Sequence, residues 1–547
     1  MRPIVLILFA SLLCLHEPLR AADTTRARYG PIDDQAAADH DDDDGPAAPR
    51  RAIALPPETP SAIRAAALAD LPVGTWHSAL ALAYWTSPAV LAQRALLKSS
   101  DYRIAEARAA YGVQLDYQLM AGWQRDRYNP TALQQQLGQI TPTTSWGWSN
   151  SAMAVLTMPL FTFGRNFAAE RGAAAQRAWQ KQVLRQTEQQ ALFDALAAYA
   201  GVIRDRAAVA IAQDNQAALA REWQADSIRL HAHEITATDL DLVATRSAEA
   251  EAQVYAAQSA AASSEAAFVQ KVGMRPAPVL DPAPALPVPV ATLDDAFAFA
   301  EAHSPVILAA HERERVSRAG IAAARANLLP RVDLRATALY ASQSPYDTYA
   351  RYNEEIASVV ITGPIFESGM RRTQIADAVA ANDSDWRLID AATRDTRAVI
   401  AAAWNDWRAQ QASAARYTAA VRAAQAAYDG ALIQLRAGQI TTFDVLQVAL
   451  ELLNVRNAAN QAQANATIDA ARIMALIGAM EPAALLPGEP RYDDTRHLDK
   501  VRHQDDLPLV TPLLRALDGI TTPGNAPRPG RDPAAAPDQD AGPMTRR

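Results

Sequence analysis

The chain alternates between long stretches with helical periodicity and short stretches in which hydrophobic and polar residues alternate. Residues 165–233 contain no proline, and Leu192, Leu196 and Tyr199 recur at helical spacing. Residues 370–436 show the same pattern. A helix of about 68 residues would be about 100 Å long, which exceeds a globular helix and predicts a coiled-coil-like rod.

Shorter helical patterns flank both long stretches. They cover 88–110 and 239–272 around the first, and 305–328 and 441–478 around the second. These lengths predict that each long helix packs against two shorter helices laid end to end. The helices that begin near Thr75 and Thr292 would then lie close to the join.

Two segments between the helices show the period of two that is typical of strands. One hairpin is expected at about 111–158 and a second at about 331–365. The hydrophobic positions of one parity are Val113, Leu115, Tyr117, Leu119, Ala121 and Trp123, then Trp146, Trp148, Ala152, Ala154, Leu156 and Met158, and in the second hairpin Val332, Leu334, Ala336, Ala338 and Tyr340. Polar residues such as Gln114, Asp116, Asp333 and Arg335 occupy the other parity.

These strands have about the length that a tilted membrane strand needs. Aromatic residues gather at their ends, as at a membrane interface: Trp123, Trp146, Trp148, Tyr346, Tyr349 and Tyr352. A water-exposed hairpin with one buried face would give the same pattern. Four strands cannot close a membrane barrel, and lipid does not tolerate open sheet edges, so strands in a membrane would have to be pooled from several chains.

The two halves of the chain are related by an internal repeat. Ser87-Pro88 aligns with Ser304-Pro305 at an offset of about 217 residues, and Asp239 aligns with Asp444 at about 205. The first copy therefore carries about twelve extra residues in its hairpin region, where a loop is expected.

The repeat predicts a domain organisation. The expected parts are a signal peptide (1–21), a disordered acidic and Pro-rich segment (22–71), a first repeat (72–274), a Pro-rich linker (275–291), a second repeat (292–480) and a flexible C-terminal tail (481–547). Cys14, the single cysteine, lies in the expected signal peptide, and Leu13 before it disfavours lipidation.

Composition excludes several classes of function. The chain has 52 Lys and Arg against 60 Asp and Glu, and the net charge of -8 gives no support for nucleic-acid binding. No phosphate-binding loop, nucleophile elbow or zinc signature is present, so we expect neither an enzyme nor a cofactor or metal site. After the expected signal peptide, no segment offers the apolar run of a membrane helix.

Two kinds of motif resemble the TolC-like outer-membrane efflux protein family. A strand-to-helix motif occurs twice, at residues 159–164 with Pro159, Phe161 and Gly164, and at residues 364–369 with Pro364, Phe366 and Gly369. Residues 435–446 are similar to the family's helix-turn-helix signature, and residues 229–239 are a weaker first counterpart. The resemblance covers roughly residues 75–478.

This resemblance implies a mainly helical fold with a small β portion. Three chains would pool two hairpins each into a 12-stranded outer-membrane β-barrel that continues into a periplasmic α-helical barrel. It also implies a homotrimer in contact with outer-membrane lipid, docked to a periplasmic adaptor (membrane fusion protein) and an inner-membrane transporter. The chain would then be the passive exit duct of a tripartite efflux or type I secretion system.

The resemblance places the periplasmic entrance at the helix-turn-helix tips. Tip residues expected to face an adaptor or pump are Leu230, Ala232, His233, Leu435, Ala437 and Gly438. Asp444 and Asp239 correspond to acidic residues that form a constriction in relatives. A threefold ring of carboxylates would favour cations. Thr441-x-x-Asp444 and Thr236-x-x-Asp239 equally fit a helix capping box, and both roles are compatible.

The tips also depart from the family pattern. Gln447 stands where some relatives have a second acidic residue, which argues against a doubled acidic ring. Ile440 stands where a relative has Arg, so a latch at that position is not expected. His233 replaces the preferred Gly of the first turn, which puts the geometry of that turn in doubt.

A periplasmic coiled-coil scaffold or adaptor without a pore is the alternative. It would explain the helices equally well. It does not explain amphipathic hairpins at matching points of both copies, and the compact β-domain usual between the helix arms of an adaptor is not found in the sequence.

Overall fold

The structure is a computed structural model, and it describes residues 58–61, 63–65, 71–128, 131–138, 143–342, 351–504 and 506–521. All of these residues belong to one compact unit. The expected signal peptide, most of the acidic N-terminal segment, and Tyr346 and Tyr349 lie outside the described residues.

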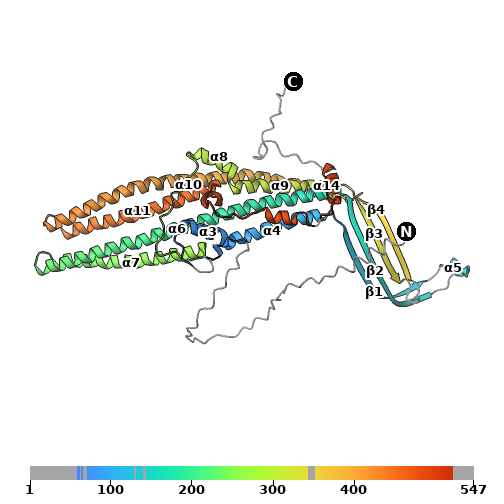
Figure 1. Ribbon diagram of the computed structural model, residues 1–547, viewed down its shortest axis with the longest axis horizontal. Coiled ribbons are helices and arrows are strands. Elements are labelled where there is room, and N and C mark those ends of the chain that lie inside the picture. The colour runs from blue at the N-terminus through green and yellow to red at the C-terminus, as the bar shows by residue number, and fades with distance from the viewer. Residues whose placement is uncertain are drawn as a thin grey trace, which may run out of the picture. The chain divides into compact units, whose positions relative to one another are not determined.

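Helices make up most of the described chain (Figure 1). The two longest, α6 (Arg165–His231) and α10 (Met370–Arg436), have 67 residues each. The other helices of the two repeats are α3 (Trp76–Thr86), α4 (Pro88–Ala109), the short α5 (Ala132–Gln136), α7 (Ala237–Val272), α8 (Leu293–His303), α9 (Pro305–Ala326) and α11 (Thr442–Ile477). Ser87 and Ser304 precede the prolines that open α4 and α9, where a missing N–H costs nothing.

Each long helix packs against two shorter helices laid end to end, as their lengths predict. Near the sheet α6 pairs with α4, where Arg177 Nε lies 2.5 Å from Asp101 Oδ1. Further along, α6 pairs with α7, where Arg206 Nη2 lies 2.7 Å from Glu265 Oε1. In the second copy, α10 pairs with α9 and then with α11 (Figure 1).

The main hydrophobic core lies at this join. Leu80 of α3, Leu196 of α6 and Phe268 of α7 are buried there. Each fully buried side chain of this size contributes about 1.5–3 kcal/mol. The Pro-rich linker packs on the same core, because the Tyr199 hydroxyl lies 3.0 Å from the Gly74 carbonyl oxygen and 2.8 Å from that of Asp281.

One glycine permits the second repeat to close at this level. Gly478 ends α11 with a φ of +85° and lies against the end of α8. A Cβ at this position would lie 2.3 Å from the carbonyl oxygen of His303. The position therefore requires glycine both for its left-handed backbone and for the close approach.

The strands form one antiparallel sheet with the order β1-β2-β3-β4. Their bounds are β1 (Gln114–Tyr128), β2 (Thr143–Phe161), β3 (Arg331–Ser342) and β4 (Arg351–Thr362). Strands β1 and β4 are its two edges, so the hairpins of the two repeats join through β2 and β3. Within the described part of the chain, no helix is both long enough and apolar enough to cross a membrane.

The register gives the sheet one apolar face. Leu115 lies opposite Leu156, Leu156 opposite Ala336, and Ala336 opposite Ala357, so these side chains share a face. That face also carries Tyr117, Leu119, Ala152, Ala154, Met158, Leu334, Ala338, Val359 and Ile361. The opposite face carries Gln114, Asp116, Gln118, Ser151, Thr157, Asp333, Arg335, Thr337 and Ser358.

The tail expected to be flexible from residue 481 is instead folded up to residue 521. It contains α12 (Pro482–Leu485), α13 (Arg496–Val501) and α14 (Val510–Thr521). Leu485, Leu486 and Val501 are buried. On the N-terminal side, Ile63 is buried in the main core, so the expected disorder of 22–71 is wrong at that position.

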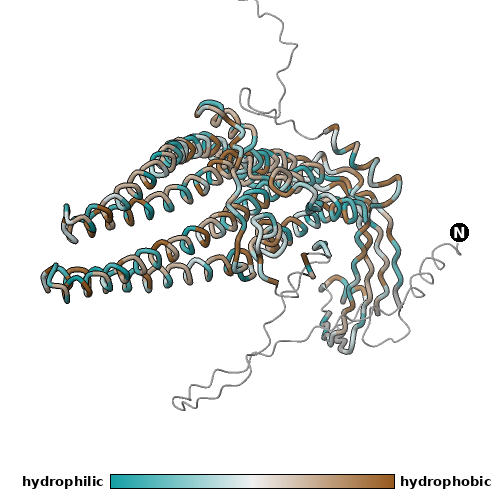
Figure 2. The backbone as a smooth tube through the Cα atoms, turned by 60° about the vertical axis from the view of Figure 1, so that its left-hand side comes forward, coloured by the Kyte–Doolittle hydropathy of each residue, from teal (hydrophilic) through white to brown (hydrophobic). Residues whose placement is uncertain are grey.

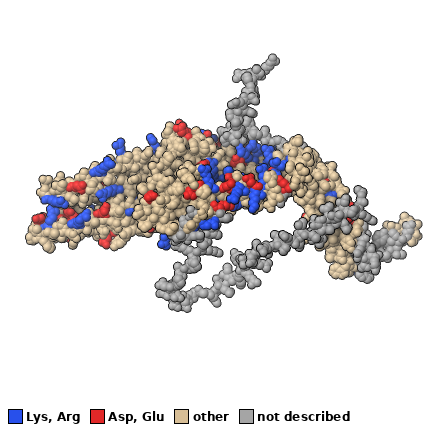
Figure 3. All heavy atoms as spheres, in the orientation of Figure 1, with Lys and Arg blue, Asp and Glu red and all other residues tan. Residues whose placement is uncertain are grey.

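The C-terminal segment runs along α4 and α6 toward the sheet and is fastened by ion pairs. His497 Nδ1 lies 2.9 Å from Asp101 Oδ2, and Arg108 pairs with both Glu170 and Asp506. Figure 3 shows Lys, Arg, Asp and Glu intermixed over this region, while the sheet is mostly uncharged. The alignment of charges explains why a Pro- and Asp-rich sequence is held in place.

We expect acid to release this segment. Burial alone would raise the pKa of Asp506, but hydrogen bonds and ion pairing with Arg108 outweigh it and lower the pKa. A carboxyl with a depressed folded pKa stabilises the attachment above its unfolded value, ordinarily 3.8, and loses this contribution as pH falls through the lower folded pKa. Limited proteolysis by pepsin at pH 2–4 should therefore cut near α13 increasingly as the pH falls.

Asp506→Asn is the matched control, because its amide cannot titrate. The variant should be cut more readily at the upper end of this range and show a flatter dependence on pH. If wild type and variant have the same pH profile, Asp506 does not control the attachment.

Candidate functional site

The two helix-turn-helix tips lie at the end of the helices farthest from the sheet (Figure 1). Figure 2 shows the α6–α7 and α10–α11 hairpins side by side, with hydrophilic and hydrophobic residues mixed up to both tips. His233 has a φ of +61° and Gly438 a φ of +71°. The first tip therefore makes the same left-handed turn as the second, although it has a histidine where glycine is favoured.

The predicted tip residues differ in exposure. Ala232, His233, Ala437 and Gly438 are exposed, Leu230 is half-buried and Leu435 is buried. Leu435 packs with Ala431 and Val445 in a small core inside the second tip. The exposed turn residues are thus the ones that a partner could contact.

Asp444 and Asp239 each close a capping box at the start of the return helix. Asp444 Oδ2 lies 2.9 Å from the Thr441 backbone nitrogen, and Asp239 Oδ2 lies 3.0 Å from that of Thr236. Hydrogen bonds from the threonine hydroxyl and then from its backbone N–H lower the pKa of both carboxyls. Both therefore stay ionised at neutral pH, and each satisfies a free N–H at a helix start.

Two further positions have different roles in the second tip. Gln447 is exposed on α11, close in sequence to Asp444, and carries no charge. Ile440 packs against Leu435 and Val445, so it belongs to the core of the tip. The second tip therefore presents one acidic residue, Asp444, at the positions where some relatives have two.

A buried carboxylate that the sequence did not single out connects the two tips. Asp226 of α6 is 0% exposed, and its Oδ2 accepts a hydrogen bond of 3.3 Å from Thr442 Oγ1, in the first turn of α11. Its Oδ1 lies 3.2 Å from Arg229 Nη1, and Arg229 Nη2 donates to the Leu435 carbonyl at 3.4 Å. Asp226 and Arg229 thus link the first hairpin to both helices of the second.

The repeat contained a signal for this contact. At the offset of 205 residues, Asp226 aligns with Ala431, which is also buried. A carboxylate where the other copy has alanine on a buried helix face requires a polar partner. The partner, Thr442, could not be identified, because it lies 216 residues away in sequence.

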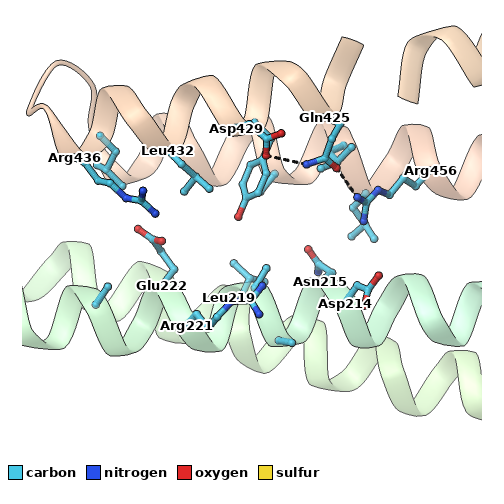
Figure 4. Close-up of a pocket in the computed structure, with 18 of the residues that line it drawn as sticks. Asp214, Asn215, Leu219, Arg221, Glu222, Gln425, Asp429, Leu432, Arg436 and Arg456 are labelled. Carbon is cyan, nitrogen blue, oxygen red and sulfur yellow. Dashed lines mark hydrogen bonds between the residues drawn. The ribbon is translucent and has the colours of Figure 1, made fainter. Parts of the chain in front are cut away.

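A charged cavity of about 720 Å³ lies between the hairpins just behind the tips. Figure 4 shows Glu222 of α6 pointing toward Arg436 of α10 across this cavity. Burial, and then the negative charge of Asp226, raise the pKa of Glu222. Its other charged lining residues are Asp214, Arg221, Arg229, Glu234, Asp429 and Arg456.

The two strand-to-helix motifs have the same backbone but different surroundings. Phe163-Gly164 and Ser368-Gly369 are both left-handed pairs, with φ of 52° and 83° in the first and 50° and 87° in the second. These pairs turn each strand into its long helix. Gly164 is buried and Phe161 and Pro159 are half-buried, whereas Phe366 is 85% exposed beside the half-buried Pro364.

Comparison with protein families identifies one match. Residues 299–479 match the family model described as outer membrane efflux protein. This range covers the second repeat from α8 to the end of α11.

Comparison with individual proteins extends the likeness to both repeats. The chain is 27% identical over 439 residues to the outer membrane efflux protein BepC of Brucella suis, covering 78% of this chain and 90% of that protein. Its fold is similar to that of VceC from Vibrio cholerae, with a TM-score of 0.61, 20% identity and coverage of 74% and 97%. It is also similar to the CmeC outer membrane channel of Campylobacter jejuni, with a TM-score of 0.64, 11% identity and coverage of 79% and 89%.

Proposed function

We infer that this chain belongs to the outer-membrane efflux protein family and serves as one subunit of an outer-membrane exit channel. The protein is located in the outer membrane, with most of the chain in the periplasm. The observation that carries this function is the four-stranded sheet, which has one apolar face and two open edges.

The apolar face has the dimensions of a membrane-spanning surface. From Leu115 to Trp123, β1 provides about nine residues, the number that a tilted strand needs to cross a bilayer. Trp123 lies directly opposite Trp148, and both are exposed, as in an aromatic girdle at a membrane interface. A water-soluble scaffold has no use for such a surface.

The open edges require other chains. In lipid, the unpaired backbone groups of β1 and β4 would each cost several kcal/mol. Pairing β1 of one subunit with β4 of the next removes every edge, and three subunits give twelve strands. The same threefold axis would arrange the paired long helices as the wall of a periplasmic tunnel.

The tips are the proposed entrance and docking surface. We place Asp444 and Asp239, with Gln447 close to the former, around the opening, and we propose that the exposed turn residues face a periplasmic adaptor and an inner-membrane pump. The duct itself is passive, because the energy for transport comes from the pump. Similarity to efflux proteins supports these partners, and the cargo is determined by the pump.

The function is tested by membrane fractionation and by the oligomeric state. The protein should co-fractionate with the outer membrane and migrate as a heat-sensitive trimer, and the purified trimer should form channels in a planar bilayer. A water-soluble monomer without channel activity would refute the proposal.

We expect Asp444 to act on the ions that enter as well as on its helix. Asp444→Asn removes the charge while leaving an oxygen that can accept the Thr441 hydrogen bonds. The variant should therefore keep a folded tip but lose cation preference in single-channel recordings. Asp241→Asn, at an exposed position of the first tip, is the control. Unchanged selectivity of Asp444→Asn would leave Asp444 with a capping role alone.

A further inference from the structure

Helix α14 has its polar and apolar faces reversed relative to an ordinary surface helix. Thr511 and Asp518 are each 1% exposed and face the protein. The outward face consists entirely of apolar residues, namely Pro512, Leu513, Ala516, Leu517 and Ile520. A helix at a protein–water boundary turns its apolar stripe inward, so this arrangement indicates an apolar environment on the outer side.

Polar bonds fix α14 at the point where the sheet meets the helices. Asp518 Oδ1 accepts a hydrogen bond of 2.8 Å from the Thr162 backbone N–H, directly after β2 ends. Arg515 Nε lies 2.5 Å from Glu170 Oε2 of α6. The apolar face of α14 therefore lies at the same level as Met158, at the lower end of the sheet's apolar face.

We propose that α14 lies in the headgroup region of the periplasmic leaflet of the outer membrane, with Leu513, Leu517 and Ile520 inserted among the acyl chains. This inference rests on the proposed membrane orientation of the sheet. Interfacial helices lie in the plane of the bilayer with their apolar face about 5–10 Å deep. In this position α14 would seal the boundary between the strands and the periplasmic helices on the lipid side.

Two other occupants of this face are less compatible with the chain. The remaining C-terminal residues 522–547 contain Met544 as their one large apolar side chain and are rich in Pro, Asp and Arg. They offer no apolar surface to cover four exposed positions, Leu509, Leu513, Leu517 and Ile520. A position inside the cylinder would place a helix about 10 Å wide in the path of the cargo.

A second subunit is the remaining alternative. In the proposed ring, the edge strand β4 of a neighbour pairs with β1, whereas α14 contacts β2, one strand further from that edge. The neighbour's exposed Ile365 and Phe366 would then lie at the base of β1. Lipid is the occupant continuous with the sheet's own apolar face, and it covers α14 without requiring a shift of the neighbour.

Single-cysteine labelling of the full trimer tests this placement. In a Cys14→Ser background, Leu513→Cys, Leu517→Cys and Ile520→Cys each place a fluorophore on the outward face of α14. The trimers are reconstituted into phosphatidylethanolamine–phosphatidylglycerol vesicles that contain lipids brominated either near the headgroup or deep in the acyl chain. Leu119→Cys reports on the sheet, and Ala437→Cys reports on the exposed tip.

The α14 labels should lose fluorescence to shallow bromines more than to deep ones. The Leu119 label, in the middle of the span, should show the opposite preference, and the Ala437 label should respond to neither. Aqueous iodide should quench Ala437 and leave the α14 labels largely unaffected.

Failure of this inference is distinct from failure of the proposed function. If the Leu119 label is quenched by lipid and the α14 labels are not, α14 does not lie in the membrane. Quenching of those labels by iodide would then indicate water, and protection from both quenchers would indicate a subunit interface. If the Leu119 label is not quenched by lipid, the membrane orientation of the sheet is wrong, whatever the α14 labels show.

Discussion

Replacing Asp226 by alanine is expected to detach the second helical tip from the first. The carboxylate is completely buried, and it accepts hydrogen bonds from Thr442 and Arg229. Hydrogen bonds to a charged group contribute about 1.5–3 kcal/mol each, and the alanine variant leaves the Thr442 hydroxyl without its acceptor. We expect a local loss of about 3 kcal/mol, since Arg229 can still reach Glu234.

This loss should be visible as faster amide exchange in the second tip. A change of about 3 kcal/mol corresponds to roughly a hundredfold increase in local opening. Hydrogen exchange measured over residues 440–446 should therefore accelerate by about that factor, while exchange at the α3–α6 core remains unchanged. In planar bilayers, the freed tip should open the channel more often.

Two matched variants make the result specific. Asp226→Asn retains an oxygen for Thr442 and should give an intermediate acceleration. Asp241→Ala removes an exposed carboxylate of the same tip and should give none. If Asp226→Ala and Asp241→Ala behave alike, the buried carboxylate does not hold the tips together.

Replacing Leu119 by arginine should prevent or strongly destabilise membrane assembly. Leu119 lies in the middle of the apolar face of β1 and is exposed in the single chain. A guanidinium on the lipid side near the bilayer midplane costs about 2–4 kcal/mol, and each trimer would carry three. The fraction of heat-resistant trimer after refolding into vesicles should fall accordingly.

The adjacent Gln118 provides the control, because successive strand residues face opposite sides of the sheet. Gln118→Arg places the same charge on the polar face, where water would fill the channel, and should leave the trimer yield nearly unchanged. Equal losses in both variants would show that the proposed lipid-facing side is assigned incorrectly.

The sequence predicted those features that depend on short-range pattern. The 3.6-residue period and the absence of proline predicted two helices that the structure places at Arg165–His231 and Met370–Arg436. The period of two placed Leu115 and Leu119 on one face, and the strand register confirms this. The Thr-x-x-Asp spacing predicted both capping boxes, because all their atoms lie within one helical turn.

Features that depend on distant partners were missed or predicted wrongly. Residues 482–521 have the composition of a flexible tail, yet they fold because Arg108 and Glu170 supply charges from nearly 400 and 350 residues away. His233 adopts the left-handed turn of Gly438 although its side chain disfavours that conformation. The reversed faces of α14 became meaningful only when its place beside β2 was known.

The sequence by itself determined the repeat, the long helices, the amphipathic strands and hence the class of membrane duct, because periodicity is a property of neighbouring residues. The tertiary structure decided which charges are buried, how the two tips are linked through Asp226, and where the C-terminal helix lies. The physical reason is that the cost of burying a polar group depends on its partner, and the partner is brought into contact only by folding.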